Sequence, residues 1–267
     1  MNSNKIPATV EILTRNSAKT LRRALESVKD FAEIIILDGG SRDETLDIAH
    51  EYGARVIEQD TQFLRADGSI ADFSGVRNQG LTTASYDWFF FLDSDEEASV
   101  ALIDSIRNIV QQNISSVYWV NRHYKYKGDV ITCSASYPNR QVRFFHRSLV
   151  SHFRKPIHEI PVMSDEVVLQ TLNHGLLVPA DLSESELEVR KKMHTYITLD
   201  LNRHDPFHFA DLVRIYINVF RSLARLIFKS VLVALFCRGK RLPFIAEQRP
   251  FIYQFLLMKE ALKKWIT

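Results

Sequence analysis

Short apolar runs alternate with segments of helical periodicity from Ala8 to Val110. Each run has the length and apolar character of a buried strand. Strands that alternate with helices at this spacing predict an α/β fold with a mostly parallel sheet and helices on both faces. The predicted N-caps are Ser17 and Asp72, and Gly53 is a predicted helix stop. The predicted strands cover residues 8–14, 33–38, 54–59 and 86–92, and the predicted helices cover residues 17–30, 42–53, 72–85 and 97–110.

Polar clusters follow three of these strands directly. They are the segments "ILTRN", "LDGGS" and "FLDSDE". Ligands of open α/β sheets bind beyond the carboxyl ends of the strands. We therefore expect the three clusters to meet in one crevice.

The most abrupt of these transitions is "FFFLDSDEEAS", where four large apolar residues run into a group of carboxylates. Carboxylates placed together repel one another unless they are solvated or share a cation. Two aspartates one residue apart, Asp93 and Asp95, are suited to one hard divalent cation, with a diphosphate as a further ligand. The alternative is that Asp95 or Glu96 caps the helix that follows.

Composition places the chain among folded globular proteins. It has 267 residues, 46% of them apolar and 25% charged, with a formal net charge of +2. Cys133 and Cys237 lie far apart in the sequence, which predicts neither a disulfide framework nor a zinc site. The first residues lack the long apolar core of a signal peptide. A reducing, cytoplasmic location is therefore expected.

The order of four motifs resembles the family 2 glycosyltransferases, which have the GT-A fold. These motifs are "ILTRNSAKTLRRALESV", "IIILDGGSRDETLDIA", "FSGVRNQGL" and "DWFFFLDSDEE", and the resemblance runs from the start of the chain to about Ile160. More narrowly, the sequence is similar to the branch of lipopolysaccharide-core β-1,4-glucosyltransferases. The resemblance implies an inverting transfer of a sugar from a nucleotide sugar, usually a UDP-sugar, assisted by Mg²⁺ or Mn²⁺.

The resemblance also implies a nucleotide pocket. Asp38 matches the acid that hydrogen-bonds the uracil ring, and the backbone of Thr14, Arg15 and Asn16 would line the same pocket. The alternative for Asp38 is an Asx-turn into the two glycines that follow it. The family often has a glutamate after the asparagine where this chain has Ser17, so the nucleoside pocket departs from the family in this detail.

The implied phosphate and metal site involves four further residues. Asp93 matches the first aspartate of the D-x-D motif, near the ribose and the metal, and Asp95 matches the principal metal ligand. Arg77 and Asn78 match an arginine–asparagine pair beside the phosphates and sugar of the donor. The alternative for Arg77 is an ordinary surface residue.

An inverting transfer needs a base for the acceptor hydroxyl. Many family members use an E-D pair after D-x-D, and none is found here. The segments "RQVRFFHR" and "IHE" are instead similar to the R-x-x-R-x-F and V-H-E elements of the core-glucosyltransferase branch. Glu159 is thus the candidate base, and its neighbour His158 is a third metal ligand or contacts diphosphate or acceptor. The alternative is a polar pair on a strand edge.

Arg140 and Arg143 lie in the first of these elements. They suit a pyrophosphate or a phosphorylated acceptor. The equally weighted alternative is that both are solvated positive charges.

The last third of the chain is basic and apolar. The apolar segment 210–241 is interrupted by the cations Arg214, Arg221, Arg225 and Lys229, and it therefore fails as a membrane span. At 100° per residue, these cations fall with Asn218 within an arc of roughly 80° on one helix face. Such a helix suits the headgroup region of an anionic membrane surface, and a second segment, 249–267, repeats the pattern and contains Trp265. The alternative is a helix packed on the catalytic domain.

Together these features predict a GT-A catalytic domain over residues 1–180 and a helical, membrane-binding region over residues 181–267. The expected acceptor is a lipid-linked envelope glycan, and the expected location is the inner face of the cell membrane. The apolar content argues against a nucleic-acid partner. A processive polymerase is disfavoured because Q-x-x-R-W is missing.

Two rival functions remain open. A nucleotidyltransferase would be expected to carry a glycine-rich basic loop near its N-terminus, and "ILTRNSAKT" has no glycine. An inactive scaffold is disfavoured by the intact Asp93 and Asp95.

Overall fold

The computed structural model describes residues 5–180, 185–202 and 206–266. The chain forms two compact units, and each is described by itself. The sheet unit comprises Met1–His123 and Asn139–Pro179, and the helical unit comprises Tyr124–Pro138 and Ala180–Thr267. The division predicted between residues 180 and 181 adjoins residues 181–184, which lie outside the described part, and it stays a prediction.

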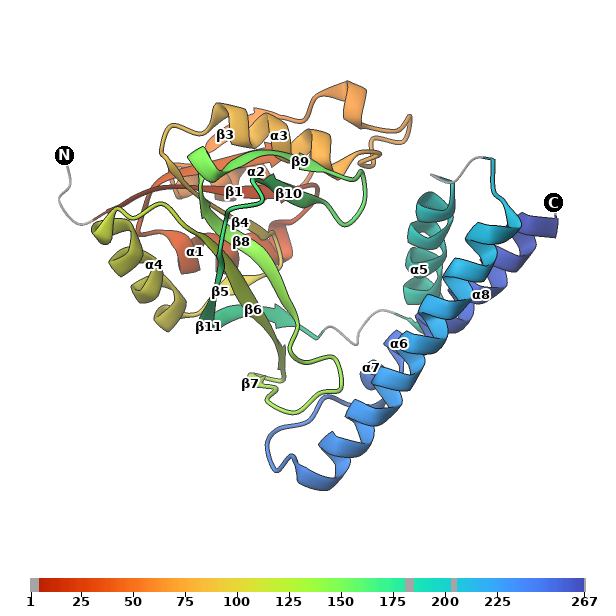
Figure 1. The fold of residues 1–267 in the computed structure, drawn as a ribbon. Coiled ribbons are helices and arrows are strands. Elements are labelled where there is room, and N and C mark those ends of the chain that lie inside the picture. Colours follow the sequence, from red (N-terminus) through yellow and green to blue (C-terminus); the bar gives the residue numbers. More distant parts are fainter. Residues whose placement is uncertain (1–4, 181–184, 203–205, 267) are drawn as a thin grey trace. The chain divides into compact units, whose positions relative to one another are not determined.

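The strands are numbered in chain order, and Figure 1 labels those for which there is room. They are β1 (Ile6–Thr14), β2 (Phe31–Asp38), β3 (Arg55–Glu58), β4 (Trp88–Asp93), β5 (Glu97–Ala98), β6 (Val117–Tyr126), β7 (Asp129–Val130), β8 (Arg140–His146), β9 (Val150–Arg154), β10 (Ile160–Met163) and β11 (Leu169–Pro179).

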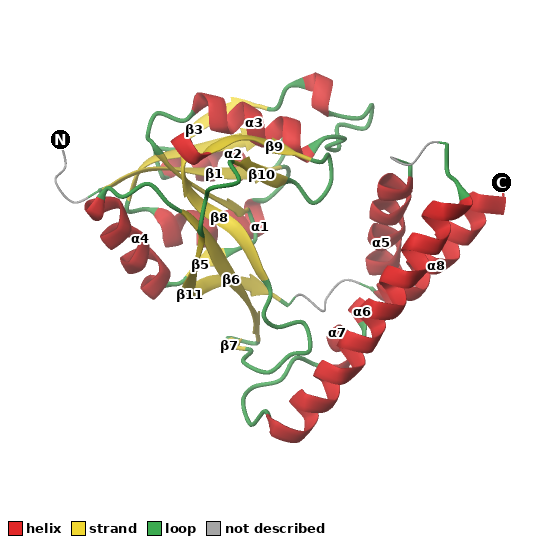
Figure 2. Cartoon of the chain, in the orientation of Figure 1, coloured by secondary structure: helices red, strands yellow, loops and turns green. Residues whose placement is uncertain are grey.

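Figure 2 shows the helices in red. The α-helices are α1 (Ala18–Val28), α2 (Thr45–Glu51), α3 (Phe73–Thr83), α4 (Val100–Gln112), α5 (Glu186–Leu201), α6 (Phe209–Phe236), α7 (Phe244–Glu247) and α8 (Arg249–Ile266), and two 3₁₀ turns are η1 (Thr61–Phe63) and η2 (Arg147–Leu149).

The main sheet is mixed. Its order is β3-β2-β1-β4-β8-β6-β11-β5, and β7 pairs with β6. The four strands predicted from the sequence, β1 to β4, pair in parallel, and β8 then adds to β4 in the antiparallel sense. The α/β class is therefore confirmed, whereas the sheet has a larger antiparallel part than the sequence up to Val110 indicates.

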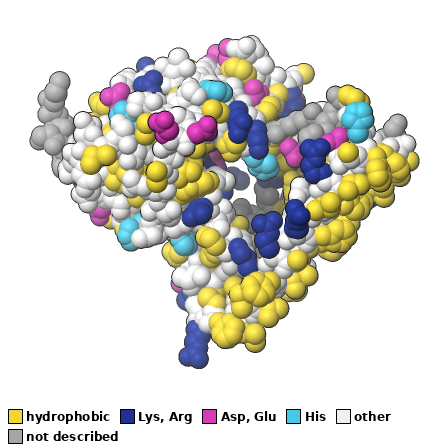
Figure 3. All heavy atoms as spheres, in the orientation of Figure 1, with side chains coloured by type: hydrophobic (Ala, Val, Ile, Leu, Met, Phe, Trp, Pro, Cys, Tyr) yellow, Lys and Arg dark blue, Asp and Glu magenta, His cyan; other side chains and the backbone are white. Residues whose placement is uncertain are grey.

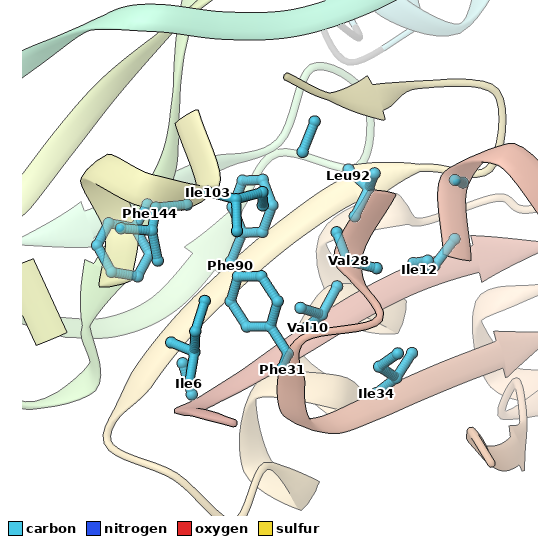
Figure 4. Close-up of a cluster of buried hydrophobic side chains, with 14 of the residues drawn as sticks. Ile6, Val10, Ile12, Val28, Phe31, Ile34, Phe90, Leu92, Ile103 and Phe144 are labelled. Carbon is cyan, nitrogen blue, oxygen red and sulfur yellow. The ribbon is translucent and has the colours of Figure 1, made fainter. Parts of the chain in front are cut away.

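Strand β4 is buried on both faces, as its apolar run predicts. Phe90 and Leu92 belong to a core cluster that includes Ile103 of α4, and Figure 4 draws part of this cluster. Phe89 and Phe91 point into a second cluster with Val76 of α3. Because successive side chains of a strand point to opposite faces, one run of aromatic residues holds a helix layer on each side of the sheet.

Local capping fixes where two of the helices begin. Asp72 accepts a hydrogen bond from the backbone N–H of Gly75 and so caps α3, as predicted. Ser17 precedes α1 but makes no side-chain cap bond. Helix α4 is capped by Ser99, and Glu97 lies in strand β5, so the predicted helix start at residue 97 is wrong.

The helical unit has its own small core. Ile197 of α5, Leu212 of α6 and Ala261 of α8 pack together in it. Large apolar side chains remain exposed along α6 and α8, and Figure 3 shows hydrophobic side chains gathered there. Among the described residues, no helix combines the length and the apolar character needed to cross a bilayer.

The prediction of no disulfide framework needs one correction. Cys133 and Cys237 form a disulfide that joins the segment after β7 to the residue that ends α6. Backbone bonds support the same junction, because Lys240 O accepts from the N–H groups of Thr132 and Cys133. Sequence separation, here 104 residues, does not measure distance in space.

Loss of this disulfide is expected to destabilise the helical unit. A variant with Cys133→Ser and Cys237→Ser should lose about 2–5 kcal/mol of unfolding free energy, because the cross-link restricts the unfolded chain. Thermal unfolding with and without a reductant measures the effect, and the double variant is the control that should not respond. A native protein whose melting temperature ignores the reductant would contradict the prediction.

Candidate active site

Parallel pairing brings the polar ends of three strands to one edge of the sheet. Thr14 at the end of β1 lies opposite Asp38 at the end of β2, and Leu13 lies opposite Asp93 at the end of β4. The three clusters thus share one edge of the sheet, and the crevice expected there stays a prediction. This edge is the candidate active site.

Asp38 builds the turn after β2. Its Oδ2 accepts from the backbone N–H groups of Gly40 and Ser41 at 2.9 and 2.7 Å. Its Oδ1 accepts from the hydroxyls of Thr14 and Ser41. This is the turn geometry given above as the alternative for Asp38. Since a carboxylate has about four acceptor sites, a contact to a uracil ring requires one hydroxyl to turn away.

The loop after β1 is tied to this turn. Asn16 adopts a left-handed backbone, with φ of 51°, and its side chain accepts from the N–H of Arg42 at 2.8 Å. Arg15 is exposed and donates to the carbonyl of Asp67 at 2.6 Å. Ser17, where the family often has glutamate, lies 3.0 Å from the hydroxyl of Ser94. The loop therefore reaches both the turn and the acidic segment.

The acidic segment does not cap a helix. Ser99 performs that role for α4, so the capping alternative for Asp95 and Glu96 is excluded. Glu96 is buried and accepts from the backbone N–H of Asp93 at 3.0 Å. Asp95 is exposed at the rim.

Three arginines surround Asp93. Arg77 lies 2.8 Å from its Oδ1, Arg143 lies 3.0 Å from its Oδ2, and Arg122 approaches Oδ2 at 3.9 Å. Arg122 and Arg143 also contact Glu96. Arg143 is buried, so it is neither a solvated charge nor open to a pyrophosphate without rearrangement.

The other arginine of that element behaves differently. Arg140 is exposed and stacks over the ring of Trp119, with 5.4 Å from the guanidinium carbon to the ring centroid. Arg140 is thus a solvated positive charge, which is the alternative that the sequence analysis gives for it.

Arg77 is the centre of the cluster. Its side chain is only 1% exposed, so the alternative of a surface residue is wrong. It contacts Glu11 at 2.9 Å and the candidate base Glu159 at 3.3 Å, in addition to Asp93. Its guanidinium also stacks on Phe91 at 4.6 Å. Because its side chain is buried and pairs with three carboxylates, the predicted place of Arg77 beside the donor's phosphates stays a prediction.

Asn78 holds the hairpin that carries Glu159. Its Nδ2 donates to the carbonyl of Phe153 at 3.0 Å, and its Oδ1 accepts from the N–H of the same residue. The amide therefore replaces a neighbouring strand for β9. Glu159 follows on the β9–β10 loop, with its side chain 17% exposed. Its neighbour His158 is exposed and has φ of 54°.

Burial and neighbouring charges shift the pKa values of the acidic residues at this edge. Burial raises the pKa of Asp93, but Arg143 and Arg77 more than offset this, so its pKa lies well below the usual range. Partial desolvation and the charges of Asp93 and Glu96 raise the pKa of Asp95. Burial, opposed by Arg77, raises the pKa of Glu11 to about 7.

Asp95 and Asp93 suit a hard cation in part. Both offer carboxylate oxygens, and the like charges around Asp95 favour a neighbouring positive ion. Among the residues that the structure describes, no group of three or more metal-binding side chains gathers, so His158 does not complete a ready-made set. Further ligands would have to come from the diphosphate and water.

Sequence reasoning missed three members of the cluster. Glu11, Glu96 and Arg122 received no role, although each has a signal in the sequence. Glu11 lies inside the apolar run "TVEIL", and a charged residue within such a strand needs a buried partner. The partner itself cannot be read from the pattern.

Comparison with known proteins finds a family match over more than half of the chain. Residues 9–158 match the family described as Glycosyl transferase family 2. A TPR repeat-containing protein of Synechococcus elongatus is 36% identical over 150 residues, which are 56% of this chain and 34% of that protein. An uncharacterized glycosyltransferase of Rickettsia bellii is 34% identical over 99 residues, 37% of this chain and 31% of that protein. The chain spans about a third of the length of these relatives.

Among solved structures, TarS of S. aureus (residues 1–349, in complex with UDP) is similar at 17% identity. The match has a TM-score of 0.43 and covers 73% of this chain and 65% of that one.

The parallel strands, their acidic edge and the helices on both faces define a GT-A-like α/β protein. The family match spans more than half of the chain, and the chain belongs to glycosyl transferase family 2.

Removal of Arg77 is expected to destabilise the sheet unit severely. Arg77→Met leaves the buried carboxylate of Glu11 without a counter-ion and should cost about 3–5 kcal/mol of unfolding free energy. Urea denaturation measures this. The matched control is Arg140→Met, which removes an exposed arginine and should cost less than about 1 kcal/mol. Equal losses in the two variants would contradict the central role of Arg77.

Proposed function

We propose that the chain is an inverting hexosyltransferase that moves glucose from UDP-glucose to a lipid-linked envelope glycan such as lipopolysaccharide core. One observation carries this proposal. The first aspartate of the D-x-D segment, Asp93, and the candidate base, Glu159, contact the same guanidinium, that of Arg77. A base held beside the diphosphate site is what an inverting transfer needs.

The reaction proceeds by displacement at the anomeric carbon. Glu159 takes the proton of the acceptor hydroxyl while the oxygen of that hydroxyl attacks the anomeric carbon. The bond from the carbon to the diphosphate oxygen breaks on the opposite face, and UDP leaves with the electron pair. The sugar is thereby transferred with inversion, and Glu159 later releases its proton to water.

Mg²⁺ or Mn²⁺, held by Asp95 and Asp93 together with the diphosphate, would neutralise the charge that develops on the leaving group. His158 is proposed either as an added ligand or as a contact to diphosphate or acceptor. Asp93 suits its part because its depressed pKa keeps it ionised. Arg77 and Arg143 fix the orientation of Asp93 by ion pairs.

Donor recognition is assigned to the loops after β1 and β2. The backbone of Thr14, Arg15 and Asn16 would line the nucleoside pocket, and Asp38 would accept from the uracil ring. The tight link between these loops supports a preformed pocket. Asn78 is proposed to act beside the sugar through the hairpin that it holds.

The lipopolysaccharide-core branch is supported by the place of its two sequence elements. "RQVRFF" contributes Arg143 to the ion pairs of Asp93, and "IHE" contributes Glu159 to those of Arg77. Both elements thus contain residues that contact the acidic edge. This association favours glucose as the sugar and a core glycan as the acceptor.

A lipid-linked acceptor requires an enzyme beside a bilayer. We infer that α6 lies in the headgroup region of an anionic leaflet, with its apolar side chains toward the acyl chains. Phe228 and Phe236 are 64% and 73% exposed, and Arg214, Arg221 and Arg225 are exposed too. This combination of a broad apolar face and exposed cations suits an interfacial helix.

The inner face of the cell membrane is the proposed location, because nucleotide-sugar donors are soluble metabolites. The Cys133–Cys237 disulfide is the observation that stands against a reducing compartment, since disulfides are rare there.

Donor binding should depend on Asp95. When UDP-sugars are tested one by one with Mn²⁺, the donor that the protein uses should raise its melting temperature. A ligand at 100 times its Kd adds about 2.7 kcal/mol to the free energy of unfolding. Asp95→Ala should abolish this shift and the release of UDP. Asp104→Ala, which removes an exposed carboxylate on α4, is the control and should retain both. A native protein that releases UDP from no UDP-sugar would refute the proposed function.

Membrane binding should depend on the cations of α6. Arg221→Glu with Arg225→Glu should weaken flotation with vesicles containing phosphatidylserine by at least about tenfold, because each cation near an anionic surface contributes about 1 kcal/mol. The control, Lys5→Glu with Lys19→Glu, makes the same charge change at exposed residues of the sheet unit. Flotation that is indifferent to the α6 variant would exclude the interfacial helix.

A further inference from the structure

Strand β1 contains a carboxylate that the proposed reaction does not use. Glu11 is fully buried, and its neighbours along the strand, Val10 and Ile12, are buried apolar residues. Its Oε2 accepts from Arg77 at 2.9 Å. In the described part of the chain its Oε1 has no hydrogen-bond partner. Burying a carboxylate with one oxygen unsatisfied costs several kcal/mol, so its retention calls for a physical reason.

Helix α3 is shaped to receive this carboxylate. A Cβ atom on Gly80 would lie 2.0 Å from Oε1 of Glu11, so only glycine leaves room for it. Glycine inside a helix is destabilising relative to alanine, because its backbone loses more freedom on folding. The chain thus gives up stability at two positions, one in β1 and one in α3, to place Glu11 against Arg77.

Charge balance does not explain the arrangement. Arg77, Arg122 and Arg143 are joined by ion pairs to four carboxyl groups, and the three other than Glu11 already match the three arginines in number. Without Glu11, Arg77 would still face Asp93 and Glu159. The four carboxylates are Glu11, Asp93, Glu96 and Glu159.

Geometry does explain it. A guanidinium is a rigid plane whose N–H groups point in fixed directions, so an anchor at one nitrogen fixes the other two. Glu11 holds Nη1 of Arg77 from within the sheet, while Nη2 contacts Asp93 and Nε contacts Glu159. The carboxylates of Asp93 and Glu159 thus accept from the two nitrogens of Arg77 that do not contact Glu11.

We propose that Glu11 is a positioning residue that fixes the plane of Arg77 and thereby sets Glu159 and Asp93 at their working separation. The inference rests on the proposed function, because it concerns the base and the diphosphate site of that reaction. Glu11 itself touches neither the donor nor the acceptor.

Two substitutions separate positioning from packing. Glu11→Gln keeps a side-chain oxygen that accepts from Arg77, whereas Glu11→Met has a similar size and no strong acceptor. For the native chain and both variants, kcat, the KM for the donor and the melting temperature are measured. Glu11→Met should lower kcat ten- to a hundredfold, as small misplacements of reacting groups do, with the donor KM within about twofold. Glu11→Gln should retain kcat within about threefold, because the anchor at Nη1 remains.

The matched control is Thr9→Val. Thr9 is a buried polar residue two positions earlier on β1, and its hydroxyl bonds Glu33 rather than the cluster. It should lower stability without changing kcat. Equal kcat losses in Glu11→Gln and Glu11→Met, or native kcat in a folded Glu11→Met variant, would overturn the proposal.

A readout independent of catalysis distinguishes this inference from the proposed function. The Nε–H of Arg77, assigned by NMR through its loss in Arg77→Lys, should exchange slowly with water in the native protein. Exchange should become at least tenfold faster in Glu11→Met and stay close to native in Glu11→Gln. If the native protein releases no UDP but these exchange rates behave as stated, the proposed function fails and the anchoring of Arg77 stands. Unchanged exchange in Glu11→Met would refute the anchoring itself.

Discussion

The ion cluster around Arg77 is the interaction on which the candidate active site depends. Four of its side chains are almost fully buried, those of Arg77, Arg143, Glu11 and Glu96, whereas the side chain of Asp93 is 42% exposed. An unpaired charge is costly where water is excluded, so the ion pairs stabilise the buried groups. Phe91 supports two of the guanidinium groups, at 4.6 and 4.7 Å from its ring centroid. The aromatic run of β4 therefore serves both the core and the site. It buries the strand on two faces, and its last aromatic ring supports the cations that orient Asp93.

The mixed topology of the sheet explains how so many charges meet. In the parallel half, Asp93 ends β4, and Glu11 lies inside β1 opposite Phe91, two residues before Asp93. The antiparallel strands β8 and β6 then supply Arg143 and Arg122 from the other side of β4. Asp93 of the parallel half thus pairs with Arg143 of the antiparallel half, in addition to Arg77 of α3. A wholly parallel sheet built from β1 to β4 alone would leave Asp93 with Arg77 as its main partner.

The sequence was informative where a local pattern decides the structure. Apolar runs predicted β1 to β4, parallel pairing predicted the shared edge, and Asp72 was predicted to cap α3. Pairings across the fold were missed, because hydrophobic periodicity carries no information on which distant groups meet. Glu11 and Glu96 form ion pairs with arginines that are distant in the sequence, and Cys133 and Cys237 form a disulfide across 104 residues. The acidic residues after β4 were also read as a helix start, although β5 and Ser99 come first.

Helix α3 connects the two chemical tasks of the site. One turn of it provides Arg77, which contacts Asp93, and Asn78, which holds β9 by two hydrogen bonds. The N–H of Phe73 at its start also donates to the carbonyl of Pro156 in the loop that carries Glu159. One helix thus contacts both the loop that carries the candidate base Glu159 and the first aspartate of the acidic edge, Asp93. From the side of the sheet, Gly80 lets this helix approach Glu11 closely, because a Cβ atom there would lie 2.0 Å from Oε1 of Glu11.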